Sequence, residues 1–398
     1  MHRWYNFIAG YSPEFVEGCI SGGGLRAGAL VVDPFAGCGT TLVVARSMGM
    51  RAAGFEPHPF FSLIAKAKTL ASPCVQDIDQ IRAAITRGLL SPSCEKAVSP
   101  DAWVFLSKLF ENSVLCSLLG ARVSLERAKL ERHPLAFLIL SRLVDECSFA
   151  QTDGIYKAPT SRKVAADPLK AVARIFSEIA KDILVDGNIT SPDVVIYQST
   201  SANMREIDSN SADMIVTSPP YLNNFDYAEM TRMHLYFWNM AGTWKEISNT
   251  VRANLVVNTT TALAGHRDRQ SEYASRLPSS ISGEVGEVVD SLSLVKKTKR
   301  GKKDYDLIVY PYLSQIIDVY EECFRSLKPG SVAHTVIADA AFYGIHVASP
   351  QWLVEILKMI GFSEVECRFI RKRGHRWVLE KRAGSPIGLG EYHIIARK

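Results

Sequence analysis

The sequence lacks the features that mark membrane, secreted and metal-binding proteins. None of its apolar runs reaches the roughly 20 residues that a membrane-spanning helix needs, and its first residues, Met1–Trp4, have no signal-peptide organisation. Its eight cysteines are scattered and include no Cys-x-x-Cys pair with metal-site spacing. We therefore expect reduced, mostly buried thiols in a cytoplasmic protein, with neither a bound metal nor a disulfide framework.

A large excess of charge of one sign is also missing. The 46 Lys and Arg residues against 41 Asp and Glu leave a formal net charge of +5, which excludes a basic tail protein. Positive charge instead gathers locally, in Lys296–Lys303 and in Arg368–Arg382, where His375 and Trp377 are interleaved. Such runs are often solvated loops, but they suit phosphate contacts once a polyanionic substrate is suspected on other grounds.

Near the N-terminus, a glycine-rich turn joins a short apolar run to a helical stretch. Ala29–Val32 predicts a buried strand, and Asp33–Thr41 (Asp-Pro-Phe-Ala-Gly-Cys-Gly-Thr-Thr) leads into a helix predicted over Leu42–Arg46. This is the first unit of a doubly wound α/β fold, in which ligands bind beyond the carboxyl ends of the strands. A second predicted strand, Ala52–Phe55, ends at Glu56, which is placed to accept hydrogen bonds from ribose hydroxyls.

Two other nucleotide-binding loops fit this turn less well. A nicotinamide-type fingerprint needs a third glycine where Leu42 stands, and a P-loop needs a lysine after Gly39, where there is none. A purely structural turn is the remaining alternative. The occurrence of both Asp33 and Glu56 after the two predicted strands favours a site for S-adenosyl-L-methionine over that alternative.

A second motif, Thr217–Tyr221 (Thr-Ser-Pro-Pro-Tyr), directly follows the apolar run Met214–Val216. Its two prolines fix the backbone, so carbonyl groups can point at a ligand without moving. The tyrosine offers a stacking face, and the serine offers a small hydrogen-bonding group. These properties suit a pocket for a flat, amine-bearing ring, although an unrelated turn can carry Pro-Pro-Tyr by chance.

Taken together, the two motifs resemble those of the S-adenosylmethionine-dependent DNA amino-methyltransferases, which methylate N4 of cytosine or N6 of adenine. The segment His2–Phe15 resembles the cofactor-cradling motif of that family. Leu327–Gly330 and Val332–Ile337 resemble its fifth-strand region, and Gly361-Phe362 with Tyr392–Ala396 resembles its antiparallel last pair of strands. The likeness leaves a long central insertion uncovered.

The resemblance implies a Rossmann-like, doubly wound α/β sheet with a reversed last strand and a large, mainly helical insertion. Residues 1–70 are expected to form the donor-binding part and residues 191–398 the catalytic part. Residues 71–190 would be the insertion, a candidate target-recognition lobe. Residues 249–303 would be a basic irregular segment with little helical periodicity beyond Glu284–Leu294.

The insertion is predicted to be helical because apolar residues recur at helical spacing over Trp103–Leu119, Leu135–Val144 and Leu169–Leu184. It is far longer than an ordinary crossover between strands. Within it, the polar, glycine-bearing segment Gln151–Lys163 is either a plain surface loop or a loop that contacts the substrate.

The family mechanism implies a role for each catalytic residue. The Pro219 carbonyl and the Ser218 side chain would accept the two hydrogens of the target amine, while Pro220 stiffens the segment and Tyr221 stacks on the base. The methyl group would move in one in-line displacement without a covalent intermediate, so catalysis is mainly positioning and electrostatics. In duplex DNA, the base must first leave the stack.

The remaining donor contacts follow from the same likeness, and the nucleic-acid contacts follow mainly from the basic clusters and the polar loop described above. Ser201 is included because Gln198–Asn203 lacks the Asp that commonly lies near the donor adenine. The expected donor contacts are Tyr5, Asn6, Asp33, Phe35, Ala36, Gly37, Gly39, Thr40, Thr41, Glu56 and Ser201. The expected nucleic-acid contacts are Lys157, Arg162, Lys163, Asn223, Lys297, Lys299, Arg300, Arg371 and Arg373.

The target base stays open at this point. A serine in the first position of the second motif, here Ser218, favours N4 of cytosine, whereas Asp or Asn there favours N6 of adenine. An RNA base is a further alternative, although no appended RNA-binding module is visible. A catalytically silent subunit is another alternative, and the intact motifs argue against it.

Overall fold

A seven-stranded sheet organises the fold in this computed structural model, which describes residues 1–398 except 6, 8–9, 71–74, 153–156, 187–192 and 374–388. The strand order is β10-β11-β7-β6-β1-β2-β5. The strands are β1 (Leu30–Asp33), β2 (Arg51–Phe55), β5 (Val194–Tyr197), β6 (Ala212–Thr217), β7 (Leu327–Ala338), β10 (Ser363–Arg373) and β11 (Leu389–Arg397).

Strand direction confirms the expected fold class. The strands β5, β2, β1, β6 and β7 pair in parallel, whereas β11 is antiparallel to both of its neighbours, β7 and β10. The last strand is therefore the reversed one, as predicted.

Helices cover both faces of this sheet, so its central strands are apolar on both sides. On β1, Val31 faces the helices α1 (Pro13–Gly22) and α2 (Thr40–Ser47). The next residue, Val32, faces α14 (Tyr305–Ser326) and α15 (Ser349–Ile360) on the other side. On β6, Met214 and Val216 face α1 and α2, whereas Ile215 between them faces α14 and α15.

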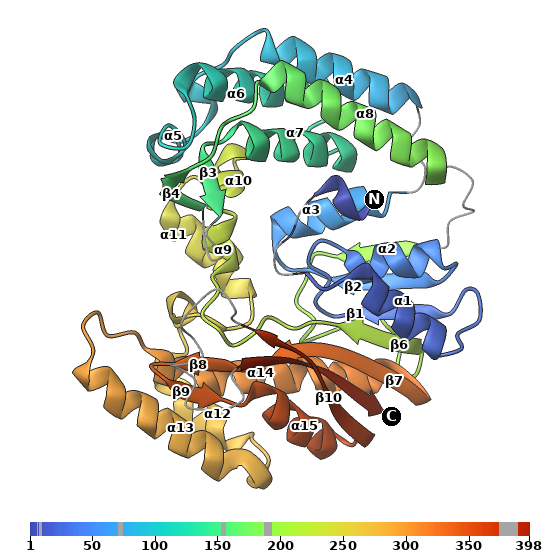
Figure 1. The fold of residues 1–398 in the computed structure, drawn as a ribbon, viewed down its shortest axis with the longest axis vertical. Coiled ribbons are helices and arrows are strands. Elements are labelled where there is room, and N and C mark those ends of the chain that lie inside the picture. Colours follow the sequence, from blue (N-terminus) through green and yellow to red (C-terminus); the bar gives the residue numbers. More distant parts are fainter. Residues whose placement is uncertain (6, 8–9, 71–74, 153–156, 187–192, 374–388) are drawn as a thin grey trace.

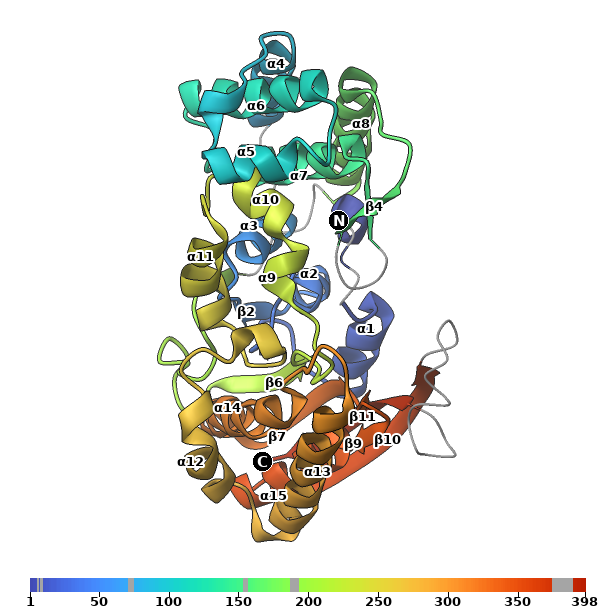
Figure 2. The same ribbon diagram turned by 90° about the vertical axis from the view of Figure 1, so that its left-hand side faces the viewer.

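A mainly helical lobe lies between β2 and β5 in the chain and stands beyond one end of the sheet (Figures 1 and 2). It consists of α4 (Val75–Leu89), α5 (Pro100–Leu106), α6 (Asn112–Arg127), α7 (Pro134–Cys147), α8 (Pro168–Asp186), the short helix η2 (Glu95–Ala97) and the hairpin β3 (Ala150–Thr152) and β4 (Lys157–Arg162). The stretch Trp103–Leu119, predicted as one helical run, is divided between α5 and α6. Helices α4 and α6 approach so closely that a Cβ on Gly88 would lie 2.4 Å from the Gly120 oxygen.

Two elements outside the lobe complete its apolar core. They are α3 (Pro59–Lys68), which follows β2, and α10 (Arg232–Phe237), which lies shortly after β6. Phe60 of α3 and Phe237 of α10 belong to the same buried cluster as Phe137 of α7. The lobe therefore packs on segments that also flank the carboxyl ends of the strands.

The segment 249–303 differs from its prediction. It was expected to be irregular apart from helical periodicity over Glu284–Leu294, but it contains α12 (Gln270–Ser275) and the 20-residue helix α13 (Ser279–Thr298), which extends beyond that stretch at both ends. Ile281, Val285 and Leu292 of α13 are buried in the cluster formed by α14 and α15, so tertiary packing stabilises a helix whose own periodicity is weak beyond that stretch.

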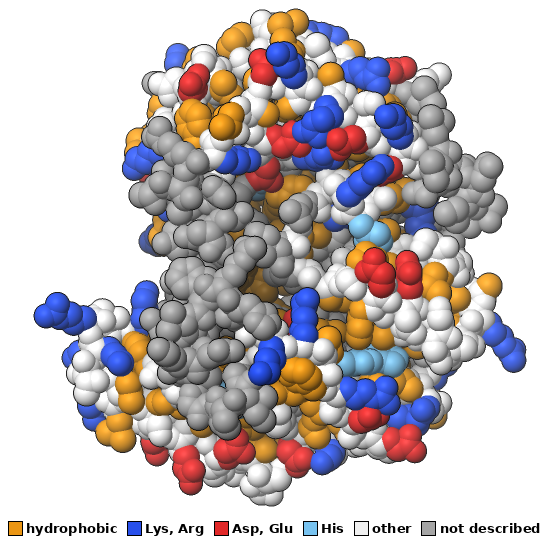
Figure 3. All heavy atoms as spheres, in the orientation of Figure 1, with side chains coloured by type: hydrophobic (Ala, Val, Ile, Leu, Met, Phe, Trp, Pro, Cys, Tyr) orange, Lys and Arg blue, Asp and Glu red, His pale blue; other side chains and the backbone are white. Residues whose placement is uncertain are grey.

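Short elements connect these parts. They are η1 (His2–Trp4), α9 (Tyr227–Met230), α11 (Trp244–Glu246), the π-helical turn η3 (Ile247–Val251), η4 (Arg252–Asn254), η5 (Thr260–Ala262), η6 (Arg267–Arg269) and the hairpin β8 (Ala340–Phe342) and β9 (Ile345–Val347). The visible face of the molecule is hollowed between the lobe and the part that bears the sheet, and Lys and Arg side chains stand on both sides of the hollow (Figure 3).

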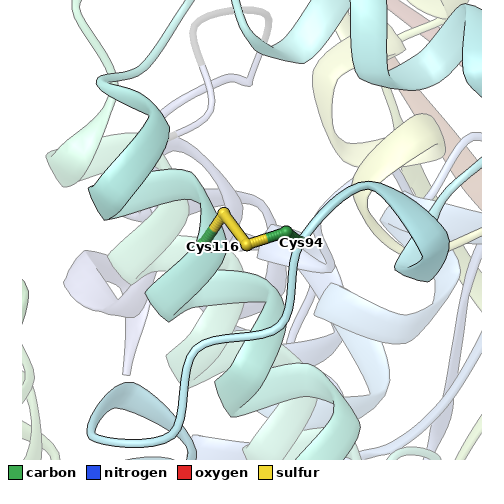
Figure 4. The surroundings of a disulfide bond; sticks show 2 residues. All are labelled: Cys94 and Cys116. Atoms are coloured by element: carbon green, nitrogen blue, oxygen red, sulfur yellow. A yellow bond between two sulfur atoms is a disulfide. The ribbon is translucent and has the colours of Figure 1, made fainter.

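One prediction about the cysteines is wrong. Cys94 and Cys116 form a disulfide, with their Cα atoms 4.6 Å apart (Figure 4). The Ser93 N–H donates to the Cys116 carbonyl at 2.9 Å, which holds the two segments side by side. A spacing of 22 residues gives no sign of this contact, because the path of the lobe creates it. Among the described residues, no helix has the length and apolar character needed to cross a membrane.

Candidate active site

A pocket of about 830 Å³ opens where the polypeptide leaves the carboxyl ends of β1, β2, β5 and β6. Four loops supply much of its wall: Phe35–Cys38, Glu56–His58, Thr200–Ser201 and the segment that contains Ser218 and Pro220. Doubly wound sheets bind ligands at this edge.

The glycine loop, Asp33–Thr41, contributes to the pocket wall. Gly37 and Gly39 have φ values of +50° and +82°, in the left-handed region that side chains disfavour. Gly39 is the N-cap of α2, and a Cβ there would lie 3.1 Å from the Ala65 Cβ on α3. The loop can therefore turn sharply while α2 and α3 stay in close contact. The Ala36 N–H donates to the Phe55 carbonyl at 3.0 Å and ties the loop to β2.

Asp33 braces the loop from behind rather than lining the pocket. Its carboxylate accepts hydrogen bonds from the Thr217 hydroxyl (2.6 Å), the Phe35 N–H (3.0 Å) and the Tyr11 hydroxyl (3.2 Å). Tyr11 also contacts the Thr41 hydroxyl, which donates to the Val216 carbonyl at 3.2 Å. These bonds join the ends of β1 and β6 to α2. Burial raises the pKa of Asp33, and the hydrogen bonds oppose this shift.

Glu56 is the acidic group of the pocket wall. Burial raises its pKa to about 8, while hydrogen bonds from the backbone N–H groups of His58 and Gly37 lower it. The His58 N–H donates to Oε1 at 2.7 Å. His58 also caps α3 and bonds the Thr231 hydroxyl at 2.8 Å, and it lines the pocket beside Glu56. Glu56 thus presents a buried carboxyl group to whatever occupies the pocket.

A hydrogen-bond network orients Tyr221. Its hydroxyl donates to Glu391 Oε1 at 2.9 Å, and Arg371 Nε donates to Glu391 Oε2 at 2.7 Å. The Ser218 hydroxyl lies 3.5 Å from the Tyr221 hydroxyl. Burial and the nearby Glu391 carboxylate raise the pKa of Tyr221, so the phenol keeps its proton and remains a donor.

The rest of the second motif is anchored through Pro220. Its carbonyl accepts a hydrogen bond from the buried Tyr312 hydroxyl of α14 at 2.9 Å. This bond does not involve the Pro219 carbonyl, which is the acceptor that the family mechanism requires. The anchor therefore holds the segment in place without using that group.

The predicted donor residues divide between the pocket wall and its support. Those on the wall are Phe35, Ala36, Gly37, Thr40, Glu56 and Ser201. Asp33, Gly39 and Thr41 support the loop instead, as described above. Tyr5 lies against His234, with its hydroxyl 3.2 Å from Nε2, and packs edge-on against Phe60. Asn6 lies outside the described residues.

Several wall residues were not predicted. Phe7, Gly10 and Tyr11 line the pocket, and they belong to the N-terminal motif from which Tyr5 and Asn6 were chosen. Tyr227, whose place shortly after the second motif predicts a position on the pocket wall, lines it too, as do Asn254–Val256. No sequence signal marks the latter segment. It is held near the pocket because Arg252, just before it, pairs with Asp226 at 2.9 Å.

Three of the predicted nucleic-acid contacts lie beside the second motif. The Arg373 guanidinium is 5.0 Å from the centre of the Tyr221 ring, and Arg371 binds Glu391. Asn223 forms the turn after Tyr221, with its N–H 2.8 Å from the Tyr221 carbonyl. The continuation of this basic cluster, 374–382, lies outside the described residues.

The other predicted contacts are more distant in the fold. Lys297 is exposed in the last turn of α13, and Lys299 and Arg300 are exposed just after it. Lys163 donates to the Asp145 carbonyl at 2.6 Å, so it serves the internal structure of the lobe. Lys157 and Arg162 belong to β4, but their side chains lie outside the described part of the structure.

Comparison with known proteins agrees with this geometry. No protein-family model matches the chain. It is 22% identical to the type II methyltransferase M.BsoBI of Geobacillus stearothermophilus in a 446-position alignment that covers 100% of this chain and 84% of that protein. The homologues of this chain are type II methyltransferases. It is also 21% identical to the type II methyltransferase M.AvaI of Nostoc sp. and of Anabaena variabilis, over 91% of this chain and 79% of each relative.

The share of this chain that the alignment covers is as informative as the sequence identity. Because the alignment with the M.BsoBI methyltransferase spans this whole chain, it includes the helical lobe as well as the sheet. The lobe is therefore part of what this chain shares with its methyltransferase homologues.

Proposed function

We propose that this protein transfers a methyl group from S-adenosyl-L-methionine to an exocyclic amine of a DNA base, with N4 of cytosine as the favoured target. One observation carries the proposal: a single pocket is lined both by the glycine loop with Glu56 and by Ser218 and Pro220 of the second motif. A donor on the loop side and a base on the motif side would meet within one pocket. The similarity to type II methyltransferases supports DNA as the substrate.

The pocket residues fit the chemical groups of the donor. Glu56 can accept hydrogen bonds from ribose hydroxyls, and the aromatic rings of Phe7, Phe35 and Phe61 offer apolar surface to a flat heterocycle. Ser201, which is only 2% exposed, adds a hydroxyl at the end of β5. When bound, S-adenosyl-L-methionine supplies an electrophilic methyl group.

The second motif would prepare the base amine for attack. The lone pair of the amine nitrogen is delocalised into the base ring. Acceptors aimed at the two amine hydrogens therefore favour the pyramidal geometry that attack requires. Ser218 Oγ and the Pro219 carbonyl would be these acceptors, with Tyr221 stacked on the ring. In this mechanism no group of the protein forms a covalent bond to the substrate, so the rate depends on positioning and electrostatics.

Serine at position 218 favours N4 of cytosine over N6 of adenine as the target. Arg371 and Arg373, near Tyr221, and the exposed Lys297, Lys299 and Arg300 would contact phosphates. If the substrate is duplex DNA, the target base must rotate out of the stack to reach the pocket, at a cost of a few kcal/mol.

Methyl transfer from tritiated donor to unmethylated genomic DNA and, in parallel, to total RNA tests the proposal. Nucleoside mass spectrometry of the product is expected to show N4-methylcytosine in DNA. N6-methyladenine would retain the mechanism and change the base, while label only in RNA would contradict the proposed substrate. Absence of label with intact donor binding would contradict the proposed activity and favour the silent-subunit alternative.

Donor affinity is expected to rise with pH and to level off above about pH 8. The pKa of Glu56 is raised to about 8 by burial, so below this pH the carboxyl carries a proton that must leave before the carboxylate can accept hydrogen bonds from the ribose. The dissociation constant should therefore fall by up to about tenfold per pH unit below pH 8. Isothermal titration calorimetry across this range measures the effect.

The Glu56→Gln variant is the matched control, because glutamine keeps the shape of the side chain and does not titrate. Its donor affinity should be weaker and nearly constant with pH. The same pH dependence in this variant would show that another group is responsible.

A further inference from the structure

Three potential metal ligands from distant parts of the chain meet on one face of the sheet. They are Cys19 on α1, His334 on β7 and His393 on β11. Their ligand atoms all lie within 4.8 Å of one another, and His334 Nδ1 is 3.0 Å from His393 Nε2. None of them lines the methyl-transfer pocket, so the cluster is separate from the proposed activity.

The strand register explains how the two histidines meet. His393 pairs with Val336, and His334 pairs with Ile395, so the histidines are diagonal neighbours on β7 and β11. Ala333, which precedes His334, and Ile394, which follows His393, face the core on the opposite side of the sheet. Both imidazoles consequently point to the side covered by α1, where the Cys19 thiol is only 7% exposed.

Charge around the cluster does not exclude a cation. Arg368 of β10 is opposite His393 in the sheet, but its guanidinium pairs with Glu366, with Nε 2.6 Å from Oε1. The Phe15 ring packs edge-on against His393, with ring centroids 4.8 Å apart, and shields the cluster on the α1 side. The result is a partly buried site with one thiol and two imidazoles.

We propose that Cys19, His334 and His393 bind one Zn²⁺ ion, with the fourth position held by water. Zinc binds thiolate at about 2.3 Å and imidazole at about 2.0 Å in tetrahedral geometry, so its ligand atoms lie roughly 3.3–3.6 Å apart. A cluster already within 4.8 Å reaches this arrangement with small side-chain rotations. The Cys19 thiol proton would be released to solvent when the Zn–S bond forms.

Such an ion would fasten α1 to the β7 and β11 pair. The helix α1 begins shortly after Tyr11, which lines the methyl-transfer pocket and bonds Asp33. The proposed zinc is therefore structural, and it would act on the N-terminal wall of the pocket rather than on the reaction itself.

Metal analysis of the full-length, untagged protein tests this site. After removal of metals with a chelator, titration with Zn²⁺ against a chromogenic chelator is expected to show one ion per chain and a higher thermal unfolding midpoint. The Cys19→Ser and His393→Gln variants should lose this binding. Cys367→Ser is the matched control, because it removes an exposed thiol from the adjacent strand β10 and should bind normally.

Substitution with Co²⁺ keeps the test decisive even if a variant folds poorly. Thiolate-to-cobalt charge-transfer absorption in the unmodified protein would show that a cysteine is a ligand, and its loss in Cys19→Ser alone would identify that cysteine. No bound zinc, no charge-transfer band, or equal loss in Cys367→Ser would overturn the proposal. The cluster would then be a hydrogen-bonded histidine pair beside a buried thiol.

Discussion

Replacement of Tyr221 with Ala is expected to lower the rate of methyl transfer by roughly 100-fold and to leave donor affinity within about twofold. Stacking of a base on an aromatic ring contributes about 1–3 kcal/mol, and loss of the ring also removes the partner that Glu391 and Arg373 hold in place. The donor side of the pocket is formed by other residues, so binding there should persist.

Two further variants separate the ring from its hydroxyl. Tyr221→Phe and Glu391→Gln keep the ring but remove or weaken the 2.9 Å hydrogen bond, and each should reduce the single-turnover rate by only about threefold to tenfold. Single-turnover transfer with tritiated donor and calorimetric donor binding measure the two effects. A normal rate of methyl transfer in Tyr221→Ala would refute the proposed base pocket. Equal losses of rate in Tyr221→Ala and Tyr221→Phe would show that the hydroxyl, not the ring, is responsible.

Replacement of Gly37 with Val is expected to weaken donor binding by more than about 100-fold. Gly37 has a φ of +50°, which a β-branched residue adopts only with strain. Its Cβ would lie 3.4 Å from the Phe7 ring, so the two methyl groups of valine would enter the space between loop and ring. Transfer should fall in parallel, since the donor no longer occupies its side of the pocket.

Gly49→Val provides the control for strain alone. Gly49 has a φ of +78°, and a Cβ there meets nothing within 4 Å. This variant should lose some thermal stability and retain donor binding. If calorimetry showed normal donor binding by Gly37→Val, the assignment of the loop to the donor would be wrong.

The parts of the fold that local sequence encodes were predictable. The strands β1 and β2 were placed within one residue, because each is a continuous apolar run followed by polar or glycine-rich residues. Ser201 was proposed as a donor contact from the loop after β5; the structure places it on the pocket wall, and its role stays a prediction. These features depend on a strand and the few residues beyond it, which a linear pattern can indicate.

Features that depend on contacts between distant segments were not predictable. Tyr221 and Glu391 are 170 residues apart in the chain and meet only because β11 lies next to β7 and β7 next to β6. The helix α13 extends beyond its periodic stretch Glu284–Leu294 because it packs on α14 and α15. The Cys94–Cys116 disulfide and the cluster of Cys19 with two histidines likewise arise from the path of the chain.

The shared core of the lobe has a consequence for engineering and for the divergence of related enzymes. Phe60 lies two residues after His58 on the pocket wall, Phe237 lies a short way after the second motif, and both are buried with Phe137 of the lobe. A graft of residues 71–190 alone would cut through this core. An exchange of the lobe that keeps its core intact would have to transfer α3 and α10 with it, so the lobe and the pocket loops next to these helices are inherited as one unit.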